Sequence, residues 1–328
     1  MKKLLKENFK FIIVLILIIV LFSIKFPYYI DAPGGIDDVS RKISIEGYES
    51  SGSFNLAFVR EYRATIPTLI LSAFNKDWKI LKSEDVLLDE ENNASYLLRD
   101  KILLQESISN AISVAYTYAS KDIKVISNKI IVTYVDTNAK TNLNVNDQII
   151  SIDNIKINTK SDIENIVNTK NIGDIINIEV YNKGKKYNRY AYIIEEDNSK
   201  KIGLIISNIR EYDTHPEVSV KTDKNESGSS GGLITALSIY DSLTKEDITH
   251  GLTIVGTGTI DIEGNVGSIG GVEYKLKSAV KAKADLFLVP VGENYDSALR
   301  LKEKNNYNIE IVGISTFREA IDYLSSIK

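Results

Sequence analysis

The chain has 328 residues, of which 43% are hydrophobic and 26% charged, and its formal net charge is −4. These proportions are those of a folded globular protein, and the length exceeds one ordinary hydrophobic core, so two or three domains are expected. The acidic balance offers no basic surface for nucleic acid. Cysteine is absent and the two histidines are His215 and His250. Disulfides, thiolate metal sites and multi-histidine metal centres are therefore excluded, and no metal or other cofactor is expected.

The first thirty residues combine a basic segment with an apolar one. Lysines stand at positions 2, 3, 6 and 10, and residues 9–29 are otherwise apolar except for Lys25. Such a stretch can cross a bilayer if Lys25 extends its amine to the surface. We expect a cytoplasmic tail over 1–8, a single transmembrane anchor over 9–29 and the remainder outside the cell membrane, because the positive charges precede the span. A cleaved signal peptide is the alternative, although no small residues mark a cleavage site.

The next region, over 30–121, is expected to be a separate extracytoplasmic unit. Short apolar runs between turn residues over 39–82 predict strands, and the apolar spacing over 97–119 predicts a helix. No motif in this region assigns it a role.

Residues 122–196 have the pattern of a small α+β domain. Strands are predicted at 130–135, 174–181 and 187–194, and a helix at 161–168. The pattern Leu-x-x-x-Asp-x-Ile-x-x-Ile-Asp is matched by Leu143, Asp147, Ile149, Ile152 and Asp153. This region resembles a PDZ domain of the bacterial protease-associated type, with a generic α+β domain as the alternative. The resemblance implies binding of a peptide as an added strand, although the carboxylate-binding loop of that family is not legible. The bound segment could be a C-terminus, an internal segment or another part of this chain.

A glycine-rich turn between a strand and a helix presents the first candidate for chemistry. A strand is predicted at 217–220 and a helix at 233–243, and the turn between them contains Gly228, Ser230 and Gly231. Glycines let the backbone approach a substrate closely, and amides at the start of a helix can stabilise an oxyanion. A flexible glycine–serine loop would have the same composition.

A lysine near the start of a later helix presents the second candidate. A strand is predicted at 252–261, a turn follows at 263–265, and a helix begins near Val272. Lys275 therefore lies close to the positive end of that helix, where a cation is disfavoured, and burial would lower its pKa further. The resulting neutral amine could act as a general base. When only its position in the helix is considered, an ordinary solvent-exposed lysine is the alternative for Lys275.

Three motifs in this part of the chain occur in a recognisable order. They are Gly228-Ser229-Ser230-Gly231, Thr257-Gly258, and the segment Gly264-Asn265-Val266-Gly267-Ser268-Ile269-Gly270-Gly271 followed by Lys275. Residues 197–328 thereby resemble the proteolytic domain of Lon-type serine–lysine endopeptidases. With the anchor and the PDZ-like segment in front, the chain resembles YlbL-type membrane proteases. The resemblance implies Ser230 as nucleophile and Lys275 as general base, with Thr257, Gly231 and Gly228 in support.

The chain departs from the family pattern on both sides of the nucleophile. The proline that the family has before the nucleophile is Ser229 here, and the alanine after it is Gly231, so Ser229 is an alternative nucleophile. The spacing to Ile239 and Thr244 favours Ser230. His215 and His250 fall in no motif that would bring them to the serine.

The sequence thus predicts an α+β protein with a transmembrane anchor, a PDZ-like domain and a Lon-type catalytic domain. We expect a membrane-anchored serine endopeptidase that cleaves envelope or secreted proteins. Its sequence has no Gly-x-x-x-x-Gly-Lys-Ser/Thr phosphate loop, so its proteolysis is expected to be independent of ATP. The resemblance also implies a ring of identical chains, expected to be a hexamer. The alternative is a non-catalytic adaptor that only binds peptides.

Overall fold

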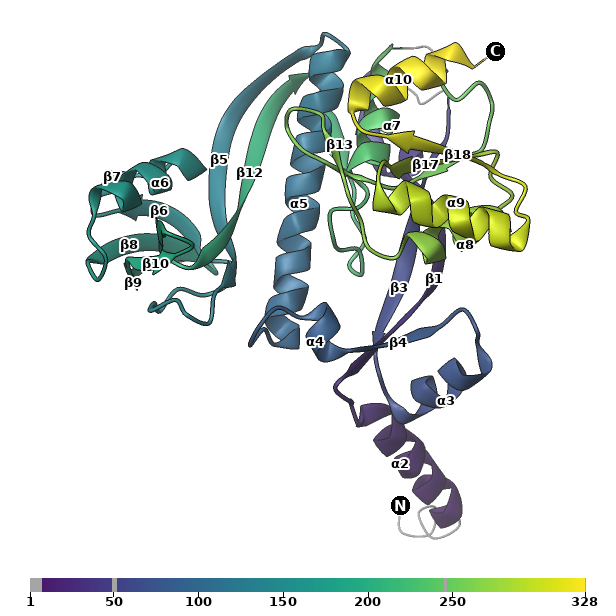
Figure 1. Cartoon of the computed structure of the whole chain (residues 1–328), viewed down its shortest axis with the longest axis horizontal. Coiled ribbons are helices and arrows are strands. Elements are labelled where there is room, and N and C mark those ends of the chain that lie inside the picture. The colour runs from purple at the N-terminus through teal and green to yellow at the C-terminus, as the bar shows by residue number, and fades with distance from the viewer. Residues whose placement is uncertain (1–7, 49–51, 245–246, 328) are drawn as a thin grey trace.

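The computed structural model describes residues 8–48, 52–244 and 247–327 (Figure 1). In Figure 1 a helix projects at the N-terminal end, a long central helix runs up the middle, and a small sheet domain and a larger α+β body lie on either side of it. The mixed α+β character agrees with the expectation from the sequence. Within the described residues, no helix is both long and apolar enough to cross a membrane.

The larger body is built on one mixed six-stranded sheet. Its four strands β18, β17, β14 and β3 are parallel, and β1 and β4 continue the sheet in antiparallel pairing. In sheet order the strands are β18 (Glu310–Ile314), β17 (Leu286–Pro290), β14 (Ile254–Gly256), β3 (Phe54–Arg63), β1 (Tyr28–Asp38) and β4 (Lys79–Lys82). The region over 30–121 is therefore not a separate unit, because β3 pairs directly with β14 and completes the sheet of the expected catalytic domain.

Helices cover both faces of this sheet, and successive side chains of a strand point to opposite faces. In β17, Leu286 and Leu288 pack into one core, whereas Phe287 and Val289 pack into the other. The first core lies beneath α5 (Asn93–Tyr118), α7 (Gly232–Thr244) and α10 (Phe317–Ser326), and the second beneath α8 (Val272–Lys281) and α9 (Glu293–Asn305). Eleven of the thirteen residues of α7 are buried, so this helix forms the centre of the body.

The smaller domain is a separate antiparallel sheet with its own core. Its order is β12 (Leu204–His215), β5 (Asp122–Val135), β6 (Gln148–Ile152), β8 (Ile175–Asn182) and β9 (Lys185–Tyr192). The predicted hairpin and helix are present, the helix as α6 (Lys160–Thr169). The expected boundary at 196 is wrong for this sheet, since β12 pairs with β5 along its whole length. The domain is thus an insertion between α5 and the second half of the larger body.

Short elements complete the chain. The remaining elements are η1 (Val39–Lys42), β2 (Ile43–Ile45), α4 (Ser83–Val86), β7 (Ile155–Lys156), β10 (Ile194–Glu196), β11 (Ser199–Lys201), β13 (Val218–Val220), β15 (Thr259–Ile260) and β16 (Val266–Gly267). Strand β13 pairs with β2 before the glycine-rich turn that leads into α7, and β15 pairs with β16 before α8.

The N-terminal helix is shorter than the anchor expected over 9–29. Helix α2 (Phe9–Ser23) has 15 residues, and the chain is extended again by Tyr28, where β1 begins. Pro27 does not favour continuation of a helix, and Tyr29 is buried against the body, where it pairs with Arg63 of β3. Tyr28 and Tyr29 therefore belong to the sheet, which corrects their assignment to the anchor.

A helix also replaces part of the strand pattern expected over 39–82. Helix α3 (Ile66–Phe74) begins with a capping box in which the side chains of Thr65 and Thr68 bond to each other's backbone N–H groups. Pro67 lies in the first turn, where its missing N–H and fixed φ suit a helix. These local signals outweigh the β-branched composition of the segment.

Candidate active site

Ser230 lies on a tight turn immediately before α7, and the end of β14 fixes the backbone of this turn. The carbonyl of Ser230 accepts hydrogen bonds from the backbone N–H of Gly258 at 2.8 Å and from the hydroxyl of Thr257 at 3.0 Å. Gly228 has a φ of +83°, a conformation that glycine adopts without strain. The glycine–serine segment is therefore an ordered turn held at several points, and Ser230 is half-buried at its apex.

Lys275 is a buried lysine in the first turn of α8. Its side chain is only 3% exposed, and its amine donates a hydrogen bond of 2.9 Å to the hydroxyl of Thr257. Burial lowers the pKa of Lys275 from 10.5 to about 7. At neutral pH a large fraction of this amine is consequently uncharged. The alternative of a solvent-exposed lysine does not apply, whereas Lys281 of the same helix is exposed.

Thr257 connects the two candidate catalytic residues. It is completely buried, and its hydroxyl accepts from the Lys275 amine while it donates to the Ser230 carbonyl. No direct hydrogen bond between the Ser230 hydroxyl and the Lys275 amine is present in the part of the chain that the structure describes. The structure thus brings Ser230, Thr257 and Lys275 together, and the amine is oriented by Thr257 beside the turn that carries the serine.

A cleft of about 730 Å³ runs alongside Ser230. Its lining includes Gly228, Ser230 and Gly231, and its walls combine apolar and charged side chains. The apolar wall residues are Ile36, Val39, Leu56, Phe58, Val59, Leu104, Ile108 and Val220, and the charged ones are Asp37, Lys42, Lys221, Asp223, Lys224 and Glu226. Ser230 lines the cleft, whereas Lys275 lies buried behind it.

Helix α5 holds the nucleophile turn through two hydrogen bonds. The sequence did not predict this contact. The hydroxyl of Ser107 donates to the carbonyl of Ser229 at 2.9 Å, and the N–H of Gly228 donates to the carbonyl of Asp100 at 2.9 Å. The carboxylate of Glu106 accepts from the N–H of Asn208 in β12 at 2.8 Å. One helix therefore contacts both the nucleophile turn and the edge strand of the smaller domain. A small hydroxyl residue within the apolar face of a helix is the signal that could have identified Ser107.

The nucleophile loop is also tied to η1. Lys42 forms ion pairs with Asp37, with Glu226 and, at 3.3 Å, with Asp223. Because Asp223 and Glu226 precede Gly228 by only a few residues, these pairs restrain the segment that leads into the nucleophile turn.

The two histidines, His215 and His250, do not line the cleft beside Ser230. His215 is an exposed residue at the end of β12, 3.9 Å from a carboxylate oxygen of Asp213. A ring nitrogen of His250 lies 3.1 Å from the carbonyl oxygen of Leu324 in α10. Neither is among the residues that line the cleft beside Ser230. The arrangement offers no histidine base to the serine.

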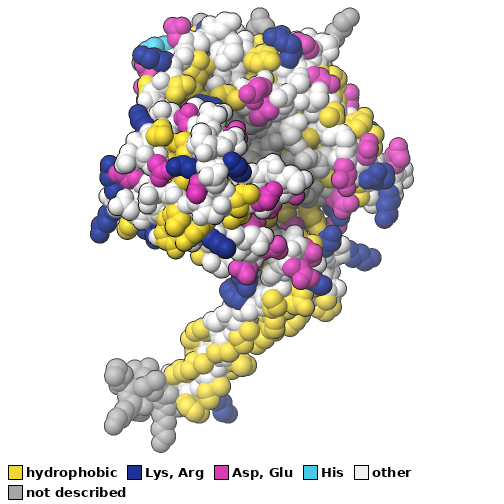
Figure 2. Space-filling view, turned by 60° about the vertical axis from the view of Figure 1, so that its left-hand side comes forward, with side chains coloured by type: hydrophobic (Ala, Val, Ile, Leu, Met, Phe, Trp, Pro, Cys, Tyr) yellow, Lys and Arg dark blue, Asp and Glu magenta, His cyan; other side chains and the backbone are white. Residues whose placement is uncertain are grey.

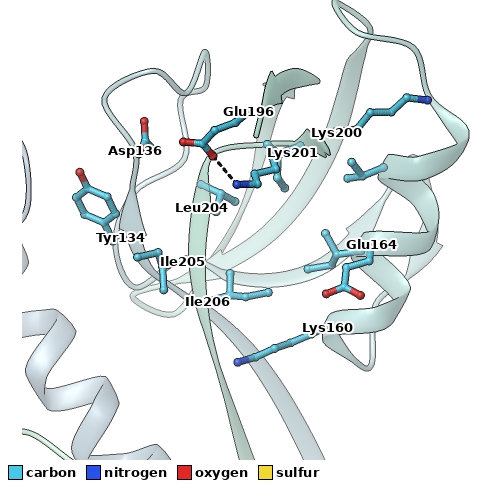
Figure 3. A pocket seen from close by; sticks show the side chains of 14 residues that line it. Tyr134, Asp136, Lys160, Glu164, Glu196, Lys200, Lys201, Leu204, Ile205 and Ile206 are labelled. Carbon is cyan, nitrogen blue, oxygen red and sulfur yellow. Dashed lines mark hydrogen bonds and ion pairs between the residues drawn. The ribbon is translucent and has the colours of Figure 1, made fainter. Parts of the chain in front are cut away.

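A second cavity, of about 490 Å³, lies in the smaller domain between β12 and α6 (Figure 3). Its apolar lining includes Ile163 and Val167 of α6 and Leu204 and Ile206 of β12, and Lys160, Lys200 and Lys201 add cationic side chains. Figure 3 shows Lys201 paired with Glu196, at 2.9 Å, beside the start of β12. Since β12 is the edge strand of its sheet, a peptide could pair with it there.

The turn before β12 contains a glycine in the left-handed conformation, which the sequence did not predict. Gly203 has a φ of +68°, and a Cβ at this position would lie 2.6 Å from the Cβ of Ala139. Gly203 therefore permits the close approach that directs the chain into the edge strand. The segment Ile202-Gly203-Leu204 lies outside the expected PDZ-like range of 122–196, yet it leads into β12 of that sheet.

Comparison with known proteins supports both halves of this description. The family model described as PDZ domain matches residues 111–189. The chain is 24% identical to a Lon protease of Aster yellows witches'-broom phytoplasma over 252 residues, which cover 74% of this chain and 26% of that protein. It is 24% identical over 315 residues to a Lon protease of Rickettsia typhi, covering 89% of this chain and 38% of the relative. Lon protease 2 of Bacillus subtilis is 34% identical over 95 residues, which cover 29% of this chain and 16% of the relative.

Among solved structures, the PDZ domain of the SdrC-like protein from Listeria monocytogenes is similar with a TM-score of 0.23 and 18% identity, covering 25% of this chain and 92% of that one. The chain spans about a quarter of the length of the phytoplasma Lon protease and about two fifths of that of Rickettsia typhi. At low identity, these relatives and the PDZ match support a Lon-type protease with a PDZ domain.

Proposed function

We propose that the chain is a serine endopeptidase in which Ser230 is the nucleophile and Lys275 the general base. The observation that carries this proposal is the buried Lys275 amine, whose pKa is lowered to about 7 and whose hydrogen bond to Thr257 orients it beside the nucleophile turn. An amine held uncharged near neutral pH can accept the proton that activates a serine. A structural role alone would not require burial of a lysine without a carboxylate partner.

Hydrolysis would proceed in two steps, which are acylation of Ser230 and hydrolysis of the acyl ester. The Ser230 oxygen attacks the peptide carbonyl carbon as its proton passes to the neutral Lys275 amine. The resulting ammonium then donates that proton to the leaving nitrogen, the carbon–nitrogen bond breaks, and an acyl ester on Ser230 remains. Water attacks the ester while Lys275 again accepts and returns a proton, which releases the acid product and restores Ser230. The backbone N–H groups of Ser230 and Gly231, which precede α7, would stabilise the oxyanion, because the helix dipole is positive there.

The two cavities suggest the kind of substrate. An edge strand beside an apolar groove suits an extended peptide, and Leu56, which lines the cleft beside Gly231, suits contact with an apolar side chain next to the cleaved bond. We therefore propose flexible or unfolded segments of envelope or secreted proteins as substrates, cleaved without ATP. The similarity to Lon proteases leads us to propose a hexameric ring of identical chains as the active assembly.

The N-terminal segment leads us to propose attachment to the cell membrane. Helix α2 is apolar and exposed, with no buried residue. The lysines at positions 2, 3 and 6 precede it, which favours a cytoplasmic N-terminus and a catalytic part on the outer side.

Hydrolysis of fluorescent casein by two neighbouring serine variants tests the peptidase proposal. Ser230→Ala should reduce kcat by several orders of magnitude, because the nucleophile and its base act as a unit. Ser229→Ala is the matched control and should keep most of the activity. Hydrolysis that survives Ser230→Ala would refute the assignment. Binding of unfolded peptides without any hydrolysis by the wild type would favour the adaptor.

A further inference from the structure

Helix α3 exposes apolar side chains on the same end of the molecule as α2. Ile70 is 56% exposed, Leu71 50% and Phe74 82%, and no residue of α3 is buried. Large apolar residues on consecutive turns of one helix, left in water, form an unfavourable surface. The side chains are too exposed to belong to the core of the body, so they require another apolar environment.

The apolar surface of α3 is continuous with that of α2. The two helices contact each other, and α2 exposes apolar residues around its circumference, with Phe11 68% and Leu17 56% exposed. Figure 2 shows hydrophobic side chains covering the projecting helix and continuing onto the adjoining end of the body. A helix that is apolar on all sides is suited to a hydrocarbon environment. A hydrocarbon environment around α2 would therefore also reach α3, because the two helices are in contact.

Polar features around this surface favour a lipid surface over a protein partner. Lys25 follows the end of α2 and Lys76 follows the end of α3, both are exposed, and each can bind an anionic phosphate group. Asp77 is engaged by the amine of Lys277 at 2.6 Å, so its negative charge is compensated. Cations around an apolar patch match the boundary between phospholipid head groups and acyl chains.

Aromatic side chains lie at the edge of the same surface. The ring of Trp78, which follows α3, stacks on that of Tyr62 in β3 with centroids 6.2 Å apart. Tryptophan and tyrosine are enriched where proteins cross from lipid to water, since their rings are apolar and carry a polar group.

We propose that α3 lies in the head-group boundary of an anionic phospholipid membrane, where it forms a second membrane contact beside α2. The inference deepens the membrane attachment proposed above and is independent of peptidase activity. Two contacts fix the orientation of the body, which one helix alone would leave free to swing. Strand β3 runs from Arg63, near this end, to Leu56, which lines the cleft. Seven residues of strand would hold Leu56, and Gly231 beside it, about 23 Å from the lipid surface.

Single cysteines can test this proposal in the full chain, because the sequence contains none. Leu71→Cys would carry an environment-sensitive fluorophore, and Leu17→Cys on α2 and Ile155→Cys on β7 would be its positive and negative controls. All three positions are exposed, at 50%, 56% and 56%. The labelled proteins are added to vesicles of phosphatidylglycerol and phosphatidylcholine with bromine on the acyl chains. We expect a blue shift and loss of intensity at 71 and 17, and no change at 155.

The outcomes separate this inference from the attachment through α2. Quenching at 17 without quenching at 71 would overturn the role of α3 while attachment stands. Absence of quenching at both positions would overturn both. A blue shift at 71 without quenching by brominated lipid would show that a second copy of the chain covers α3, which also overturns the proposal. In support, Lys76→Glu should weaken the signal at 71 on anionic vesicles and leave it unchanged on vesicles of phosphatidylcholine alone.

Discussion

Replacement of Lys275 by methionine should stabilise the protein while it abolishes catalysis. Burial lowers the pKa of Lys275 from 10.5 to about 7 in the folded chain. Between these values the unfolded chain holds a proton that the folded chain has lost, so the free energy of unfolding rises with pH over this interval. Calculated from the two pKa values, burial of the amine costs the folded state about 4 kcal/mol at pH 7 and about 2 kcal/mol at pH 9.

Lys275→Met removes this cost and keeps an unbranched side chain of similar length. It also removes the hydrogen bond from the amine to Thr257, a loss of about 1 kcal/mol, while the Thr257 hydroxyl keeps its bond to the Ser230 carbonyl. The variant should therefore be more stable than the wild type by about 3 kcal/mol at pH 7 and by about 1 kcal/mol at pH 9.

Urea unfolding followed by circular dichroism at both pH values measures this difference. Lys281→Met, at an exposed position of the same helix, is the control and should show no pH-dependent gain. A stability difference between wild type and Lys275→Met that is the same at pH 7 and pH 9 would refute the reasoning. So would a variant that is less stable than the wild type at pH 7.

Four further results are expected. The kcat/KM for casein should rise with pH around a midpoint near 7, because only the uncharged Lys275 amine can accept a proton; a flat profile from about pH 5.5 to 9 would contradict this. Thr257→Val should lower kcat about tenfold to a hundredfold with little change in KM, and Thr257→Ser should restore most of it in the same assay. Ser107→Ala should slow acylation of Ser230 by about fivefold in stopped-flow measurements, since one hydrogen bond to the nucleophile turn is lost. Gly203→Val should abolish binding of labelled unfolded peptides measured by fluorescence anisotropy, because a Cβ there collides with Ala139.

The candidate catalytic residues were selected by the resemblance to Lon-type endopeptidases, because three short motifs occur in the order of that family. Ser230, Thr257 and Lys275 each lie in a short motif, and the position of Lys275 at a helix start already favoured a lowered pKa. The structure adds what spacing cannot show, namely that Thr257 touches both partners and that Lys275 is buried. Their catalytic roles remain predictions.

The division of the chain could not be predicted, because it depends on pairing between distant segments. Nothing local to Phe54–Arg63 indicates that this strand lies parallel to Ile254–Gly256, about 200 residues later, and so completes the catalytic sheet. The same holds for β12, whose pairing with β5 extends the smaller domain beyond 196. Helix α3 is a different case. The capping residues Thr65 and Thr68 with Pro67 are visible in the sequence, but the short apolar runs between turn residues favoured strands over this segment.

Labelling of the purified protein with a serine-directed phosphonate at a series of pH values tests the proposed dyad most directly. In the wild type, the phosphonate should become attached to Ser230, identified by peptide mapping, at a rate that increases with pH around a midpoint near 7. Lys275→Met should label at least about a hundredfold more slowly at pH 8. Attachment of the phosphonate at another residue, or equal labelling rates in the wild type and Lys275→Met, would contradict the assignment of an uncharged Lys275 amine as the group that activates Ser230.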